Sequence, residues 1–212
     1  MNNIFRYGIF RFLFIIQILN GLNDAKSPSL ISLGISKSYA MSPININRLY
    51  IQSSMSFKSL PGRNNYQYHP DIGFGYKLSK NLALEGSVFN HSLDGFSDQI
   101  IRGGVQYYFG SGDTLSWVSS LKKVSYKSIK NFNLNNITLE FSKWVNYRHN
   151  FFRFGFGSNF YSKDNFSYKQ KGQVNFILLN TIIPVKFFQL GFETRMNLDM
   201  FFYSFSFLKD FY

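Results

Sequence analysis

The chain ends in the stretch Phe201-Phe202-Tyr203-Ser204-Phe205-Ser206-Phe207-Leu208-Lys209-Asp210-Phe211-Tyr212. In a β-strand, successive side chains point to opposite faces, so the aromatic residues at odd positions share one face and the serines share the other. A strand whose outer face meets lipid shows this pattern, whereas a soluble protein rarely exposes so many aromatic side chains on one strand. The stretch therefore predicts a membrane-spanning β-barrel.

The same period-two alternation recurs from residue 29 onwards and predicts ten strands. The alternating segments lie within 29–39, 49–58, 72–78, 82–88, 101–109, 137–142, 152–157, 173–178, 188–196 and 200–211. A tilted strand needs about 9–11 residues to cross a bilayer, which is about twice the length of an average globular strand. We therefore expect an all-β, closed antiparallel transmembrane β-barrel of about ten strands, with eight or twelve possible, in which 29–39 pairs with 200–211.

The connections between these strands fall into two length classes. Short ones are predicted at 79–81, 145–148 and 184–186, and longer polar ones at 59–70, 91–98 and 161–171. Outer-membrane barrels have short periplasmic turns and longer outer loops. With these ten strands, however, the turn at 79–81 falls on the opposite side of the membrane from the other short turns. A missed strand near 40–70 or a short outer turn would account for this.

One segment favours a helix. In residues 113–124, Leu115, Val118, Leu121 and Val124 recur at steps of three. Asp113 can cap such a helix at its N-terminus. Lys122 and Lys123 lie near its C-terminus, where the helix dipole favours positive charge. We predict a short amphipathic helix near 113–124, with a strand as the rival.

Residues 1–25 have the pattern of an export signal, with Arg6 before a short apolar run and Ala25 as a plausible cleavage position. The predicted domains are therefore a signal peptide at 1–25 and an outer-membrane β-barrel at 26–212. The formal net charge is +12 and there are no cysteines. The basic residues are scattered rather than clustered, which favours anionic lipid or glycolipid as a partner over nucleic acid. They include Lys58, Arg63, Lys122, Lys123, Lys127, Lys130, Lys163, Lys169 and Lys171, all in predicted loops.

The run Gly73-Phe74-Gly75-Tyr76-Lys77-Leu78-Ser79-Lys80-Asn81-Leu82-Ala83-Leu84-Glu85-Gly86 reads as a strand, a tight turn and a strand. With the export signal and the aromatic last strand, it resembles the small outer-membrane β-barrel proteins of bacteria over about residues 27–212. The resemblance implies location in the bacterial outer membrane after export through the periplasm. It also implies that the barrel-insertion machinery reads the last strand, with Phe205, Phe207, Phe211 and Tyr212 as the signal. It implies no particular activity.

The polar faces of the predicted strands carry three acids and three bases. They are Glu85, Arg102, Glu140, Arg153, Glu193 and Arg195. Charges inside a small barrel need partners, so these residues predict an interior charge network. A structural polar core and a narrow gated pore both fit this pattern.

Aromatic residues near the predicted strand ends are candidates for the girdles at the membrane surfaces. They are Tyr39, Tyr50, Tyr107, Trp117, Trp144, Tyr147, Tyr161 and Tyr203.

Catalytic signals are weak. His91 and Ser92 are adjacent, so in a strand they point to opposite faces, which disfavours a nucleophile–base relay. No metal-ligand spacing occurs and no cofactor is expected. We expect a non-enzymatic, porin-like membrane protein with a role in envelope structure, surface interaction or limited passage of small solutes. An outer-membrane lipid hydrolase or acyltransferase and a secreted soluble barrel with an apolar ligand are the alternatives.

Overall fold

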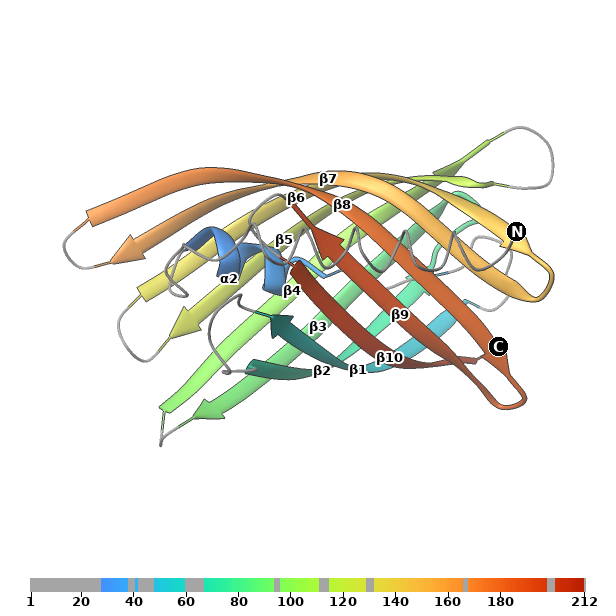
Figure 1. Cartoon of the computed structure of the whole chain (residues 1–212), viewed down its shortest axis with the longest axis horizontal. Coiled ribbons are helices and arrows are strands. Elements are labelled where there is room, and N and C mark those ends of the chain that lie inside the picture. The colour runs from blue at the N-terminus through green and yellow to red at the C-terminus, as the bar shows by residue number, and fades with distance from the viewer. Residues whose placement is uncertain are drawn as a thin grey trace, which may run out of the picture.

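The computed structural model describes residues 28–37, 41, 48–59, 67–93, 96–110, 115–128, 132–165, 168–197 and 201–211. Within these ranges, ten strands form a closed barrel around a short helix (Figure 1). The strands are β1 Leu49–Ser59, β2 Gln67–Lys77, β3 Leu82–Leu93, β4 Phe96–Phe109, β5 Trp117–Ser128, β6 Phe132–Tyr147, β7 Asn150–Asn165, β8 Tyr168–Val185, β9 Phe188–Met196 and β10 Phe201–Phe211; the helix is α2 Pro28–Ile35. The predicted closed all-β barrel of about ten strands is confirmed.

Each strand pairs antiparallel with its neighbours in the chain, and β1 pairs with β10 to close the sheet. The β2–β3 hairpin turns at residues 78–81, where the hydroxyl of Ser79 accepts hydrogen bonds from the backbone N–H groups of Asn81 and Leu82 at 3.2 and 3.1 Å. A side chain that satisfies two turn amides lets the connection stay this short.

The two ends of the barrel are named by what lies at them. At the turn end, β1, β3, β5, β7 and β9 begin and β2, β4, β6, β8 and β10 end, with the described turns 78–81, 148–149 and 186–187. The opposite end is the α2 end, because α2 lies toward it (Figure 1). All three predicted short turns thus lie at one end, which removes the conflict at 79–81.

Two predicted elements are wrong. Residues 28–35 form α2 instead of the first strand, and residues 117–128 form β5 instead of a helix. The strand that closes the barrel against β10 is therefore β1 Leu49–Ser59. The two errors offset each other in the strand count, and the rival prediction of a strand at 113–124 is the correct one.

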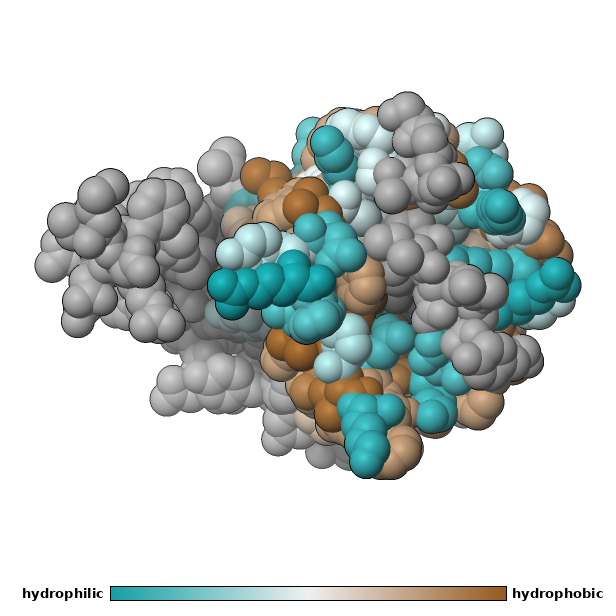
Figure 2. Space-filling model, turned by 90° about the vertical axis from the view of Figure 1, so that its right-hand side faces the viewer, coloured by the Kyte–Doolittle hydropathy of each residue, from teal (hydrophilic) through white to brown (hydrophobic). Residues whose placement is uncertain are grey.

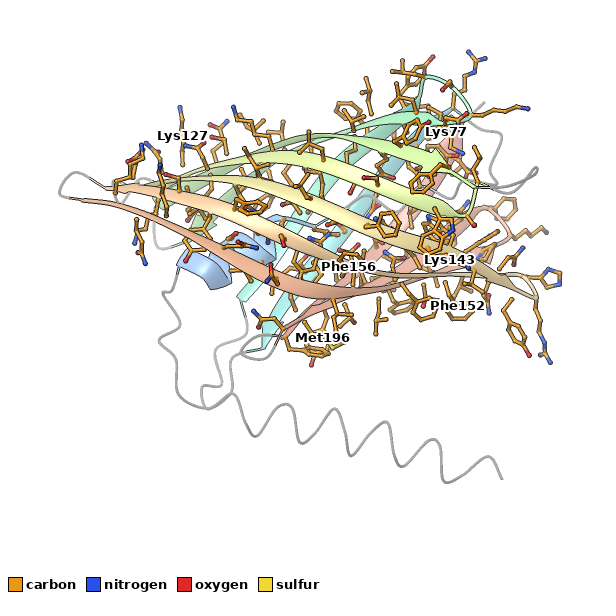
Figure 3. The ribbon with its side chains drawn as sticks, turned by 90° about the horizontal axis from the view of Figure 1, so that it is seen from above. Lys77, Lys127, Lys143, Phe152, Phe156 and Met196 are labelled. Atoms are coloured by element: carbon orange, nitrogen blue, oxygen red, sulfur yellow. The ribbon has the colours of Figure 1, made fainter. Side chains whose placement is uncertain are left out.

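The barrel wall is apolar outside and polar inside. On β7, Phe154 and Phe156 are 50% and 63% exposed on the outer surface. The neighbouring Arg153 points to the inside and is 1% exposed. Figure 3 shows Phe156 on the outer wall between the two barrel ends. The soluble alternative required the phenylalanine faces to point inward, so this side-chain arrangement contradicts it.

The interior has apolar regions near both ends and charged groups between them. At the turn end, Tyr50, Tyr108, Val118, Trp144 and Ile182 pack around Met41. Toward the α2 end, Ile35 and Leu33 of the helix pack against apolar residues of the wall. The charged layer between them is the part of the interior that the predicted site residues occupy.

Candidate functional site, a charged lumen and its inner segment

Glu140 on β6 is the centre of the charged layer. Its carboxylate lies 2.5 Å from Nζ of Lys122, 3.2 Å from Nη2 of Arg153 and 2.6 Å from Nη2 of Arg195. All four side chains are at most 2% exposed. A buried charge is tolerated only with close partners and hydrogen bonds, and Glu140 supplies an acceptor to three cations from three other strands.

Two further glutamates stand beside this centre. Glu193 accepts a hydrogen bond from Nε of Arg195 at 2.7 Å and one from the amide of Asn180 at 3.1 Å. Glu85 accepts a hydrogen bond from the amide of Gln106 at 2.6 Å. Arg195 contacts both Glu193 and Glu140, so these two carboxylates belong to one network of hydrogen bonds and ion pairs.

A second charge cluster forms around Asp71 on β2. Nη2 of Arg102 lies 2.5 Å from its carboxylate, the hydroxyl of Ser54 donates to it, and Nζ of Lys37 lies 3.8 Å away. Arg102 reaches Asp71 over β3, which lies between their strands. Lys37 follows α2 in the chain, so this cluster joins the wall to the residues next to α2.

The six predicted network residues all lie buried on the inner face, divided between these clusters. Sequence reasoning missed four more charged residues that are buried with them, namely Lys37, Asp71, Lys77 and Lys122. Lys77 and Asp71 occupy inward positions of β2. The alternation of β2 in the sequence was therefore sufficient to predict that both point inside. Lys122 was counted among the loop lysines and falls in the segment predicted as a helix, but it points inward from β5. Among the described residues, six buried cations face four buried carboxylates.

The wall holds the inner segment, defined here as described residues 28–37 and 41, through its backbone. The carbonyl oxygen of Ser36 accepts hydrogen bonds from Nζ of Lys122 at 2.8 Å and from Nη1 of Arg195 at 2.6 Å. The hydroxyl of Ser36 accepts from Arg195 at 2.7 Å and from Asn159 at 3.0 Å. Asn136 donates to the carbonyl of Ser32 at 3.2 Å. Cationic donors at the carbonyl end of a helix also complement its dipole.

Two glycines give the inner segment room against the wall. A Cβ on Gly34 of α2 would lie 3.1 Å from the ring of Phe202 on β10. A Cβ on Gly75 of β2 would overlap the side chain of Met41. Close approach of this kind favours glycine, because any larger residue would make the neighbouring side chain shift. The wall and the segment are therefore fitted to each other in shape as well as in charge.

The predicted girdle residues divide into two groups. Tyr107 and Tyr147 are exposed on the outer wall, and Trp117 and Tyr203 are partly exposed there. Figure 2 views the turn end, where hydrophilic and hydrophobic residues both lie at the surface. Tyr39 lies outside the described residues.

Three girdle assignments are wrong. Tyr50 and Trp144 lie in the apolar region at the turn end, at 4% and 5% exposure, and Tyr161 packs against the apolar clusters around α2. Each occupies an inward position of its strand. A polar-tipped ring fits inside because charged neighbours are present there, as with the guanidinium of Arg153, 5.8 Å from the ring centre of Trp144.

The aromatic last strand lies as its alternation predicts. Phe207 and Phe211 are exposed on the outer face of β10, Phe205 is partly exposed, and Ser204 and Ser206 are buried inside. Tyr212 lies outside the described residues. Recognition of this strand by the insertion machinery stays a prediction.

His91 and Ser92 lie near the end of β3, where their backbones pair with Asp98 and Ser97 of β4. Over the described ranges, no group of three or more histidine, aspartate or glutamate side chains could hold a metal ion. The one helix within those ranges is too short to cross a membrane.

Comparisons with known proteins give similar folds and no family. No family model matches the chain, and no curated protein matches it in sequence. Among solved structures, the KdgM porin matches 77% of this chain and 99% of its own, at 7% identity and a TM-score of 0.41. A bacterial polysaccharide outer membrane secretin matches 78% of this chain and 99% of its own, at 8% identity and a TM-score of 0.36.

A loop-deletion mutant of OmpT, an outer membrane protein of Vibrio cholerae, matches 79% of this chain and 60% of its own, at 7% identity and a TM-score of 0.36. The matched structures are outer-membrane β-barrel proteins. At these values the matches carry no argument about the family or the activity of this chain.

Proposed function

We propose that the protein is an integral, non-enzymatic β-barrel of the bacterial outer membrane, whose lumen is a narrow passage for small solutes that the inner segment closes. The observation that carries this proposal is the position of Ser36, whose backbone and hydroxyl are held inside the lumen by Lys122, Arg195 and Asn159.

The outer wall supports the membrane location. Large apolar side chains are exposed on all ten strands, for example Ile72 at 65% and Phe192 at 46%. A monomeric soluble protein rarely exposes a contiguous apolar surface of this extent. Strands of 9 to 18 residues are long enough to cross a bilayer at a tilt.

The lumen supports the passage. An eight-stranded barrel is just wide enough for its own side chains to fill, and barrel diameter grows with strand number. Ten strands leave space for more, and here a separate segment occupies it. The lining is polar and charged between the two apolar regions, so displacement of the segment would leave a hydrated, charged channel.

The test is single-channel conductance of the full chain in planar bilayers. The native protein should stay closed, and Leu33→Asp should open it. Leu33 packs against Val174, Phe176 and Leu178, so a carboxylate there unseats the segment and leaves the wall unchanged. A boiling-dependent shift on SDS gels would establish that both proteins are folded barrels. If the native protein and Leu33→Asp are both folded and both closed, the proposed passage is overturned.

The non-enzymatic part of the proposal has its own test. The native chain and His91→Ala should leave phospholipid vesicles equally intact, as measured by fatty-acid release. Hydrolysis by the native chain that is lost in the variant would establish the lipid-modifying alternative instead.

A further inference from the structure

The outer wall of β5 and β8 carries a lysine patch toward the α2 end, formed by Lys123, Lys127, Lys169 and Lys171, all exposed. Figure 3 shows Lys127 at the barrel end opposite to Lys77 and Lys143. One acid lies within it, Asp164, whose carboxylate is 3.5 Å from Lys169. The predicted loops of this region are thus largely strand, which fixes the lysines on a rigid wall.

Apolar side chains are interleaved with these lysines. The register pairs Lys123 with Ile137 on β6, and Ile137 with Phe160 on β7. Ile137 and Phe160 are 48% and 42% exposed on the same outer face. Neither bulk water nor bilayer hydrocarbon favours such a mixture, whereas the level of the lipid headgroups accommodates both kinds of group.

Neutral polar side chains complete the surface. The hydroxyl of Ser158 donates to Asn175 at 2.5 Å, and Gln173 donates to the same oxygen at 2.8 Å. On β5 and β6, Ser125 donates to Asn135 at 3.1 Å. An outward face with this many polar side chains fits the headgroup level better than the hydrocarbon, because water is available there to their hydrogen-bonding groups.

We propose that the lysine patch binds the phosphate groups of a phosphorylated membrane lipid, whose acyl chains lie against Ile137, Phe160 and the apolar wall below them. The patch extends about 15 Å across β5 to β8, at about 4.8 Å per strand spacing. The charge and the apolar surface thus match the two halves of one amphiphile. This inference rests on the proposed membrane location.

The test compares spin-labelled phosphatidic acid with spin-labelled phosphatidylcholine in phosphatidylcholine bilayers that contain the full chain. Electron spin resonance measures the fraction of each label immobilised by the protein. The native chain should select phosphatidic acid. The triple variant Lys123→Gln, Lys127→Gln, Lys171→Gln should lower the relative association constant by at least about tenfold, because each basic group near an anionic surface contributes a several-fold factor.

A matched triple variant removes the same charge from the turn end, through Lys80→Gln, Lys143→Gln and Lys186→Gln, all exposed in the structure. It should retain the selectivity. Equal selectivity in all three proteins, or equal loss in both variants, would overturn the lysine patch as the site. Competition by millimolar inorganic phosphate would also overturn it, because the ligand would then be a free anion. If neither label is immobilised, the chain is not in the bilayer and the membrane location itself fails.

Discussion

Glu140 and Arg195 form an ion pair across the barrel interior, with 2.6 Å between Oε1 and Nη2, although β7 and β8 separate their strands. Pairing of neighbouring strands alone would not bring these residues together. The pair fixes one part of the wall against another, and Ser36 of the inner segment binds to the same guanidinium. The stability of the barrel and the seating of the segment are therefore coupled at Arg195.

Substitution of Glu140 by glutamine should destabilise the barrel strongly. It leaves Lys122, Arg153 and Arg195 buried without their shared carboxylate, and breaking a buried ion pair costs about 3–5 kcal/mol. Urea unfolding in phosphatidylcholine vesicles measures the free energy. The exposed Lys80→Gln should change it by less than about 0.5 kcal/mol. Similar values for the two variants would mean that the network contributes little.

Substitution of Gly34 by leucine should displace α2 without adding a charge. The new side chain meets the ring of Phe202, and overpacking costs about 1–3 kcal/mol. We expect a lower free energy of unfolding and a higher conductance. Gly103→Ala is the matched control, because a Cβ there has no neighbour within 4 Å and should change neither quantity. A Gly34→Leu variant that unfolds at the same urea concentration as the native protein and stays closed would contradict the fit of α2 to the wall.

Charge on the outer wall should have a cost that depends on depth. Phe156→Arg places a cation in the middle of the apolar band, where the expected loss is about 2–4 kcal/mol. Tyr147→Arg places the same cation at the turn end, where the expected loss is about 0–1 kcal/mol. Unfolding in vesicles measures both. Equal losses would show that the apolar band is not embedded as proposed.

The two tryptophans should report opposite sides of the wall. Trp117 lies on the outer face against Phe141, with 5.1 Å between ring centres, whereas Trp144 is buried inside. Brominated lipids should therefore quench the fluorescence of Trp144→Phe, which retains Trp117, far more than that of Trp117→Phe. The opposite order of quenching would reverse the assignment of inside and outside at these positions.

Alternation predicted the barrel because lipid outside and charge inside impose opposite chemistry on neighbouring residues. It failed where that contrast is missing. On β5, Val118 and Val124 face the interior because apolar clusters line both ends of the lumen. With Leu121 facing outward, the apolar residues of β5 recur at steps of three and imitate a helix.

The error at α2 has the converse cause. Leu33 and Ile35 pack against the wall, and Ser32 and Ser36 on either side of this pair are also buried. A helix enclosed on all sides needs no single apolar face, so its sequence can alternate like a strand. The charged network followed from alternation for the strands that were correctly identified. Lys122 was missed with β5, and Lys37 because no strand pattern predicts a segment inside the lumen.

The closure of β1 on β10 joins two strands that lie far apart in the chain. The hydrogen bonds of this seam join residues 49–59 to residues 201–211, so they form only after the last strand is available. The inner segment precedes β1 in the chain and lies within the ring that this seam completes. The wall therefore encloses a segment of its own chain, and in the closed barrel the lumen is occupied by residues that precede the first strand.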